Sequence, residues 1–270
     1  DTLYQIEPVS GDAIIEVVYE NHPVKGELTV VKKGEVLKDY GKDFKYEMEN
    51  LAGAVFAIYA AEDIYTADFQ KDDAGNRILE YAKDTLVAEL TTDETGSATI
   101  KNLPLGNYRV VEKTAPDGFV HNKAEQNVQF VYVDQDTPAV VESVEFINER
   151  QKVEISVEKQ DAENGAVVAC AVFGIYNKED ITADGKVIVE ADTLLQEMTS
   201  DEKGQAGCTL DLPLGSYYVK ELKAPAGFVS SNEVLNFDAS YQGKDVGTVV
   251  LKAVKKKQTN RVELTKSDIN

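Results

Sequence analysis

Two glutamates stand at positions that a β-strand would turn toward a hydrophobic core. Glu112 follows Tyr108 and Val110 at two-residue intervals, and Glu221 ends an equivalent run later in the chain. Alternate residues of a strand share one face, so each carboxylate lies in line with apolar side chains. A buried carboxylate must be paired, hydrogen bonded or neutral, because an isolated buried charge is very costly. The other interpretation is an edge strand whose glutamate simply points to solvent.

Lysines and an amide occupy the same kind of position in other predicted strands. Lys32 is in register with Leu28 and Val30, and Lys159 ends the equivalent run of the second half. Asn148 ends a late strand whose alternate residues are also apolar. We therefore expect an amine, a carboxylate and an amide to share the core of the first half.

These residues belong to a sequence repeat. Segment 103–120 reads LPLGNYRVVEKTAPDGFV, and segment 212–229 reads LPLGSYYVKELKAPAGFV. In each copy Leu-Pro-Leu-Gly predicts a turn, the following alternating residues predict a strand, and Ala-Pro-x-Gly-Phe predicts another turn. A repeat of this length indicates two domains, each long enough to bury a core of its own.

The repeat and its junctions predict how the chain divides. Residues 22–149 form the first domain and residues 150–261 the second. Residues 1–21 contain a strand-like run after a Gly-Asp turn and are predicted to be the last strand of a preceding domain. Residues 262–270 are predicted to begin a further repeat. We expect the chain to be part of a longer array.

The spacing of strands and turns predicts an all-β fold. Short apolar runs alternate with turn signals such as those at 91–96 and 199–204, and no convincing helical period occurs. This pattern is typical of a Greek-key β-sandwich in each repeat. Segment 33–50 is the one place where a short helix or an extra hairpin is expected.

Composition excludes several classes of partner. The formal net charge is -20, from 48 acidic and 28 basic residues. Nucleic acids and anionic membrane surfaces attract positive proteins, so neither is an expected partner. No apolar run reaches the length of a membrane span and no secretory leader opens the sequence, so direct membrane insertion is not expected.

The two cysteines, Cys170 and Cys208, both fall in the second repeat. They could form a disulfide or could be two small buried residues with free thiols. The first repeat has Gly53 where the second has Cys170, so this domain type does not require the bridge.

No cofactor or metal site is predicted. Acidic turns containing Asp72, Asp73 and Asn76, or Asp180 and Asp184, lack the spacing of a twelve-residue calcium loop. The cysteines and the two histidines make no zinc or Cys-His arrangement. No combination of nucleophile, base and orienting residue indicates an enzyme.

The order of these motifs carries a family resemblance. A first-strand lysine, the strand GAVFAIY, the Glu-x-x-Ala-Pro-x-Gly-Phe segment and a last-strand asparagine follow one another. This order resembles the B-type repeat of Gram-positive collagen adhesins and SpaA-like pilins and covers nearly the whole chain. The resemblance implies prealbumin-like, inverse immunoglobulin-like sandwiches.

The resemblance also implies a spontaneous intramolecular isopeptide bond in each repeat. In the first repeat the bond would join Lys32 to Asn148, and Glu112 would promote it as a proton shuttle. Burial favours the neutral amine and the neutral acid, and folding supplies the orientation for attack on the amide carbon. The reaction is single-turnover, so the protein is not expected to be an enzyme. The alternative is a hydrogen-bonded Lys-Glu pair beside an asparagine, with no bond formed.

In the second repeat the implied bond joins Lys159 to Asn260, with Glu221 as the proton shuttle. The residues two and four positions before Asn260 are Gln258 and Lys256, where the first repeat has apolar ones. Either a bulge shifts the register or this strand is an edge with polar flanks. The second crosslink is therefore predicted less firmly than the first.

The function implied by the resemblance is a structural stalk segment of a Gram-positive cell-surface adhesin or pilus. Such a segment would be extracellular, anchored to the cell wall through other parts of its parent chain, and partnered by neighbouring repeats. The absence of a pilin-type lysine motif favours an adhesin stalk over a polymerising shaft. The alternative is a ligand-binding adhesin module that contacts host extracellular matrix protein or glycan, marked by an exposed apolar patch.

Overall fold

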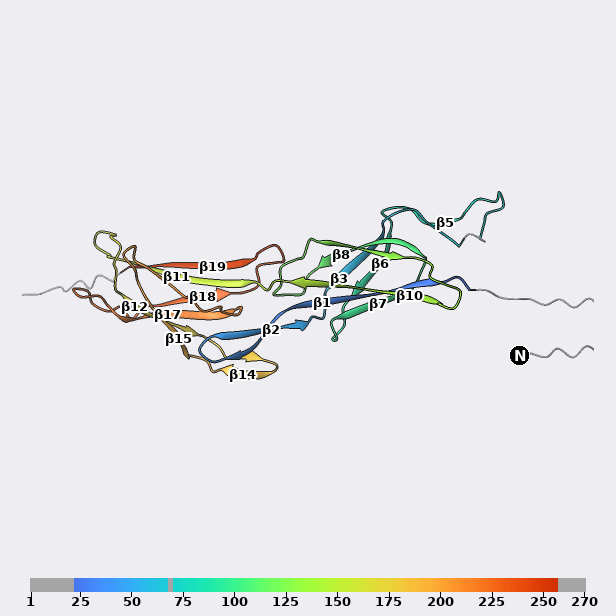
Figure 1. The fold of residues 1–270 in the computed structure, drawn as a ribbon. Coiled ribbons are helices and arrows are strands. Elements are labelled where there is room, and N and C mark those ends of the chain that lie inside the picture. Colours follow the sequence, from blue (N-terminus) through green and yellow to red (C-terminus); the bar gives the residue numbers. More distant parts are fainter. Residues whose placement is uncertain (1–21, 68–69, 257–270) are drawn as a thin grey trace, which may run out of the picture.

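The computed structural model describes residues 22–67 and 70–256, and this part of the chain contains strands but no helix. The strands form two sandwiches arranged end to end in an elongated molecule (Figure 1). The prediction of an all-β chain with two tandem sandwiches is confirmed. The predicted flanking segments, 1–21 and 262–270, lie outside the described residues.

The first sandwich pairs two four-stranded sheets. One sheet contains β1 (Lys25–Tyr40), β2 (Phe44–Asn50), β7 (Ser97–Leu103) and β10 (Ala139–Asn148). The other follows the order β6 (Leu86–Thr91), β3 (Val55–Ala60), β8 (Gly106–Thr114) and β9 (Glu125–Phe130). A small ribbon joins β4 (Ile64–Tyr65) to β5 (Leu79–Tyr81).

The second sandwich repeats this plan, with shorter strands in its first sheet. Its first sheet follows the order β16 (Gln205–Gly207), β11 (Lys152–Gln160) and β19 (Thr248–Lys256). Its second sheet follows the order β15 (Leu194–Thr199), β12 (Val172–Asn177), β17 (Gly215–Lys223) and β18 (Val234–Ala239). A separate ribbon joins β13 (Ile181–Ala183) to β14 (Lys186–Val189).

In each sandwich the first and last strands are parallel neighbours. β1 pairs with β10 from Lys25↔Ala139 to Gly34↔Asn148, and β11 pairs with β19 from Lys152↔Thr248 to Gln160↔Lys256. A parallel pair requires a long crossover, and the rest of each domain supplies it. This pairing brings the start and the end of a domain's sequence side by side.

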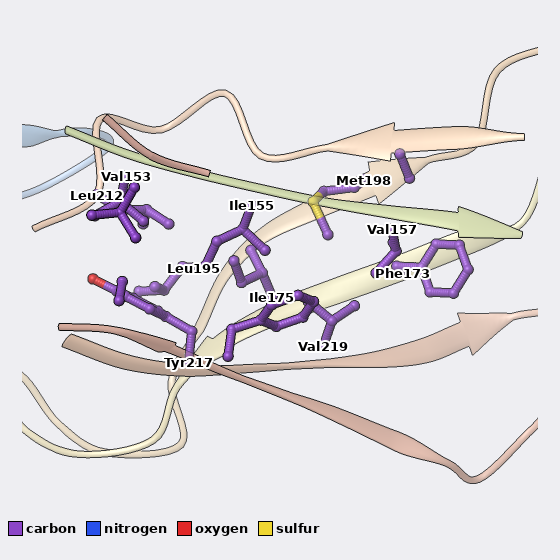
Figure 2. Close-up of a cluster of buried hydrophobic side chains, with 14 of the residues drawn as sticks. Val153, Ile155, Val157, Phe173, Ile175, Leu195, Met198, Leu212, Tyr217 and Val219 are labelled. Carbon is purple, nitrogen blue, oxygen red and sulfur yellow. The ribbon is translucent and has the colours of Figure 1, made fainter. Parts of the chain in front are cut away.

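The alternating residues of the sequence face the core as predicted. Leu28 and Val30 are fully buried with Tyr108 and Val110 in the first sandwich. In the second, Figure 2 shows Ile155 and Val157 pointing toward Phe173, Ile175 and Val219 from the opposite sheet. Each such side chain contributes about 1.5–3 kcal/mol when removed from water.

The repeated Leu-Pro-Leu-Gly-x-Tyr motif has a structural reason. The hydroxyl of Tyr108 donates a hydrogen bond to the carbonyl of Pro104 at 2.7 Å, and Tyr217 donates to Pro213 at 2.6 Å. A buried tyrosine needs a partner for its hydroxyl, and the turn four residues earlier supplies one. The motif thereby fixes where β8 and β17 begin.

The cysteines do not form a disulfide, and both are free. Cys170 is exposed and lies in a bend before β12 with a φ of 63°, so the alternative of two buried free thiols is wrong for this residue. A glycine fits this backbone more easily, which accounts for Gly53 at the equivalent place in the first repeat. Burial raises the pKa of the Cys208 thiol to about 11, so this thiol is unreactive.

Segment 33–50 is a β-hairpin, as one of the two predicted alternatives has it. The second half of β1 pairs with β2 from Lys33↔Asn50 to Tyr40↔Phe44. This hairpin extends past the first sandwich toward the second, where β2 lies beside the second sandwich in Figure 1.

Candidate crosslinking site

Glu112 lies on an interior strand. β8 is hydrogen bonded to β3 on one side and β9 on the other, and Glu112 is only 4% exposed. The interpretation of an edge strand with a solvated glutamate is therefore wrong. The carboxylate is one of the buried charges for which the core must supply partners.

Lys32 supplies the opposite charge. Its side chain is completely buried, and its Nζ lies 3.7 Å from Oε1 of Glu112. The same nitrogen donates hydrogen bonds of 3.1 Å to the carbonyls of Lys33 and Phe146. These contacts hold the amine between β1 and β10, directly beside the last residues of the domain.

Asn148 completes the group from β10. It is 2% exposed, and its Nδ2 donates to both carboxylate oxygens of Glu112 at 2.9 Å. Its Oδ1 is buried and has no hydrogen-bond partner among the described residues. Glu112 thus lies next to both nitrogens, that of the lysine and that of the amide.

Burial changes the acid-base chemistry of Lys32. Desolvation lowers the pKa of its ammonium from 10.5 to about 8, against the opposing charge and hydrogen bond of Glu112. The apolar surroundings come partly from two aromatic rings, Phe56 and Phe146, whose centroids lie 4.8 Å apart. Phe56 pairs with Glu112 across the β3–β8 ladder, and Phe146 pairs with Lys32 across β1–β10.

Sequence reasoning missed the loop that holds Glu112. The backbone N–H of Asn122 donates to Oε2 of Glu112 at 2.7 Å. His121 Nε2 donates to the backbone carbonyl of Glu112 at 2.6 Å, and Asn122 Nδ2 donates to the carbonyl of Ile147 at 2.9 Å. The hydrogen bond to the Glu112 carboxylate comes from a backbone N–H group, and the identity of a residue does not predict such a contact.

The second sandwich repeats part of this arrangement. Lys159 and Glu221 are buried, and Nζ of Lys159 lies 3.9 Å from Oε1 of Glu221. The backbone N–H of Ser231 donates to Oε2 of Glu221 at 2.9 Å, in the role that Asn122 has in the first domain. Oε1 of Glu221 has no hydrogen-bond partner within the described residues.

Asn260, the predicted amide of the second site, lies outside the described residues. The strand register still bears on it. In the first domain Lys32 pairs with Phe146, and Asn148 comes two residues later. In the second domain Lys159 pairs with Lys255, and the residue two positions later is a lysine, with Asn260 further along the sequence. The amide therefore does not follow at the equivalent position.

The acidic turns have a local explanation. Oδ1 of Asp72 accepts hydrogen bonds from the backbone N–H groups of Ala74 and Asn76 at 3.0 and 2.7 Å, so this carboxylate caps its own turn.

Within residues 22–67 and 70–256, no group of three or more His, Cys, Asp and Glu residues could hold a metal ion. A search of the same residues finds no helix long and apolar enough to cross a bilayer.

The fold and the site together define a class of protein. It is a tandem β-sandwich in which the first and last strands of a domain are parallel neighbours, with an amine, an acid and an amide buried between the sheets of the first domain. The family model described as the SpaA prealbumin-like fold domain matches residues 42–145 and 153–257. The chain therefore belongs to this family and carries two copies of its domain.

Solved structures include several similar chains. The Bacillus anthracis TIE protein is 26% identical with a TM-score of 0.56, over 87% of this chain and 34% of that one. A streptococcal ancillary pilin is 21% identical with a TM-score of 0.31, over 85% of this chain and 62% of that one. The shaft pilin SpaA from Lactobacillus rhamnosus GG is 17% identical with a TM-score of 0.32, over 88% and 100%.

The chain spans about a third of the Bacillus anthracis protein and less than two thirds of the streptococcal pilin. A search of curated protein sequences gave no match. Membership in a family of pilin-like structural domains supports a structural role in a pilus or another surface protein.

Proposed function

We propose that this chain is a stalk segment of a Gram-positive cell-surface adhesin or pilus, stiffened by autocatalytic Lys-Asn isopeptide bonds. The observation that carries the proposal is that buried Glu112 contacts both the buried Lys32 of the first strand and the buried Asn148 of the parallel last strand. A buried charged pair contributes little net stability compared with apolar residues, so stability alone does not account for this group. Formation of a covalent bond between the amine and the amide would account for their burial beside an acid.

The proposed reaction is an acyl transfer. The neutral amine of Lys32 attacks Cγ of Asn148, the C–N bond of the amide breaks, and the amide nitrogen leaves as ammonia. Glu112 contacts both nitrogens, so it can take a proton from the amine and give it to the leaving group. A half-turn of the amide about Cβ–Cγ would bring the unpartnered Oδ1 to a protonated Glu112, which would polarise the carbonyl.

The test is the intact mass of the denatured protein. Each bond removes one ammonia, about 17 Da. We expect Lys32→Ala and Glu112→Gln each to restore the ammonia lost from the first domain. The neighbouring Lys33, partly exposed and paired with Glu145, provides the control, because Lys33→Ala should leave the mass loss intact. A wild-type protein of full unmodified mass would remove the covalent part of the proposal.

The stalk role includes expectations about place and partners. The parent protein would be extracellular and attached to the cell wall through other parts of its chain, with neighbouring repeats as its partners. The predicted domain boundaries, 22–149 and 150–261, remain part of this proposal. They match the two family copies in number and order.

A second candidate is a ligand-binding module for host matrix protein or glycan. One feature favours it: Val131, Tyr132 and Val133 are consecutive and each more than half exposed. Tyr132 also lines a cavity of about 770 Å³ at that end of the first domain. Saturable binding of immobilised matrix proteins or glycans, abolished by Tyr132→Ser, would support this function. Equal binding by the variant would count against it.

A further inference from the structure

The hairpin of residues 34–50, here the clamp hairpin, is not needed to complete the first sandwich. β10 and β7 pair with β1 only as far as Gly34 and Val31, and the rest of β1 pairs with β2 alone. In the second domain β11 is followed only by a short turn, closed by the isolated bridge Gln160↔Val167, and no strand equivalent to β2 lies between β11 and β12. The clamp hairpin is therefore an addition to the repeat.

The apolar side chains of the clamp hairpin pack on the second domain. Phe44, 6% exposed, belongs to the same hydrophobic cluster as Leu212 and Tyr217. Three more side chains of the hairpin pack against that cluster: Leu37, Tyr40 and Tyr46. The rings of Tyr40 and Phe44 lie 4.6 Å apart. The first domain thus contributes part of the second domain's core.

Polar contacts surround this apolar insertion. The Tyr46 hydroxyl donates to the carbonyl of Asp211 at 2.9 Å, and Lys38 forms a 3.0 Å ion pair with Asp184. Arg150, in the linker between the domains, stacks 3.7 Å above the ring of Tyr46 and pairs with the Asp211 carboxylate. Burial raises the pKa of Tyr46, as expected for a phenol enclosed by an interface.

A second set of contacts lies beside the same linker. The backbone N–H of His121 donates to the carbonyl of Lys244 at 2.8 Å, and Lys123 pairs with Asp245 at 3.0 Å. Gln151 donates from Nε2 to the carbonyl of Gly243 at 2.7 Å. Arg150 and Gln151 are consequently buried although they join two domains. A linker between independent domains is usually exposed.

We infer that the clamp hairpin is an interdomain lock that makes the two sandwiches one rigid body. Separation of the domains would expose Phe44 to water and break the polar contacts of Tyr46 and Lys38. It would also separate Arg150 from either the Tyr46 ring on the hairpin or the Asp211 carboxylate in the second domain. These losses occur together, so the joint opens in one step. The lock does not depend on isopeptide chemistry and can be tested separately from it.

The test uses limited digestion of the intact chain with trypsin, which cuts after arginine and lysine. Arg150 is 6% exposed, so the wild-type protein should resist cleavage after this residue while exposed lysines are cut. Phe44→Asp should accelerate cleavage after Arg150 at least tenfold, as followed by the masses of the fragments. Met48→Asp is the matched control, because Met48 lies on the same strand and is 50% exposed. The control should digest like the wild type.

A second variant separates loss of the lock from loss of folding. Residues 35–49 are replaced by the five residues 162–166 of the second domain's turn. Gly34 is kept, because a Cβ there would lie 2.5 Å from the ring of Phe119. Amide NMR spectra first verify that both sandwiches of this variant are folded. The two domains should then tumble independently, each with a shorter rotational correlation time than in the wild type.

An unchanged correlation time in this variant would overturn the inference. So would equal cleavage rates after Arg150 in the wild type and Phe44→Asp. Neither result would affect the mass measurement, so failure of the lock and failure of the crosslinks are distinguishable.

Discussion

At the scale of single residues, the period of two within strands predicted most of the candidate crosslinking site. It placed Lys32, Glu112 and Asn148 on inward faces, and in the structure Glu112 contacts both of the others. It could not predict the backbone N–H of Asn122 that holds Glu112, because a backbone donor has no residue signature. It also could not foresee that Asn148 leaves its own Oδ1 unpartnered, since amide orientation depends on three-dimensional neighbours.

The acid-base state of the Lys32–Glu112 pair leads to a prediction about pH. In the reactive form, a neutral amine lies beside a neutral acid, and the pair holds one titratable proton, on the carboxyl group. The ion pair also holds one titratable proton, on the ammonium group. Burial lowers the pKa of Lys32 to about 8, so the pair loses that last proton near pH 8. The rate of first-domain crosslinking should therefore fall about tenfold per pH unit above pH 8.

The measurement needs protein that has never folded, such as chain purified in denaturant from inclusion bodies. Dilution into buffers from pH 6 to 10 starts folding, and mass spectrometry then follows the loss of ammonia. Lys159→Ala confines the reaction to the first domain. A rate that rises above pH 8 would show that only the free amine is required and that Glu112 does not act as an acid.

At the scale of elements, strand pairing separates the two predicted crosslinks. β1 and β10 place Asn148 two residues beyond the partner of Lys32, whereas β11 and β19 leave Asn260 further from the partner of Lys159. The polar residues that precede Asn260 already indicated that the register differs from that of the first domain. The strand pairing shows that Asn260 comes later in the sequence than the position equivalent to Asn148. The repeat predicted the strands, but it could not predict register at a site where the copies differ.

The register difference predicts unequal rates. Asn260 can reach Lys159 only if extra residues loop out of the strand, which costs conformational entropy before reaction. In a refolding time course, we expect the second ammonia to be lost at least tenfold more slowly than the first. Lys159→Ala should abolish only the slow loss, and Lys32→Ala only the fast one. Equal rates would mean that the strand reaches Asn260 without this penalty.

The clamp hairpin shows a different limit of sequence reasoning. Segment 33–50 suggested either a helix or a hairpin, because many charged residues are interspersed among its apolar and aromatic residues. Those residues are Leu37, Tyr40, Phe44 and Tyr46. The partners of these side chains lie in the other domain, more than a hundred residues away in sequence. Local pattern therefore indicated the hairpin but not the surface that it covers.

At the scale of the whole molecule, the proposed bonds determine which residues can carry force. With Lys32 joined to Asn148, tension entering through β1 passes directly to β10 and then to the linker. The residues from 33 to 147 then form a closed loop outside the path of the force. Without the bond, the same tension would have to be resisted by strand pairing alone.

Single-molecule pulling can detect this loop. Unfolding the first domain without its bond would release the segment between Lys32 and Asn148, roughly 400 Å at 3.3–3.6 Å per residue. We expect this extension step in Glu112→Gln and its absence in the wild type and in Lys33→Ala. A wild-type chain that shows the full step would contradict a crosslink in the first domain.

The position of the clamp hairpin has a further consequence. Residues 34–50 fall inside the closed loop between Lys32 and Asn148, so the element that stiffens the joint would bear no tension when the bond is present. Stretching then does not loosen the joint. A fibre built from such units would resist bending at its joints and would tilt as a whole. Drag from flow past the cell would then act on the attachment point as a bending moment, with little elastic extension of the fibre.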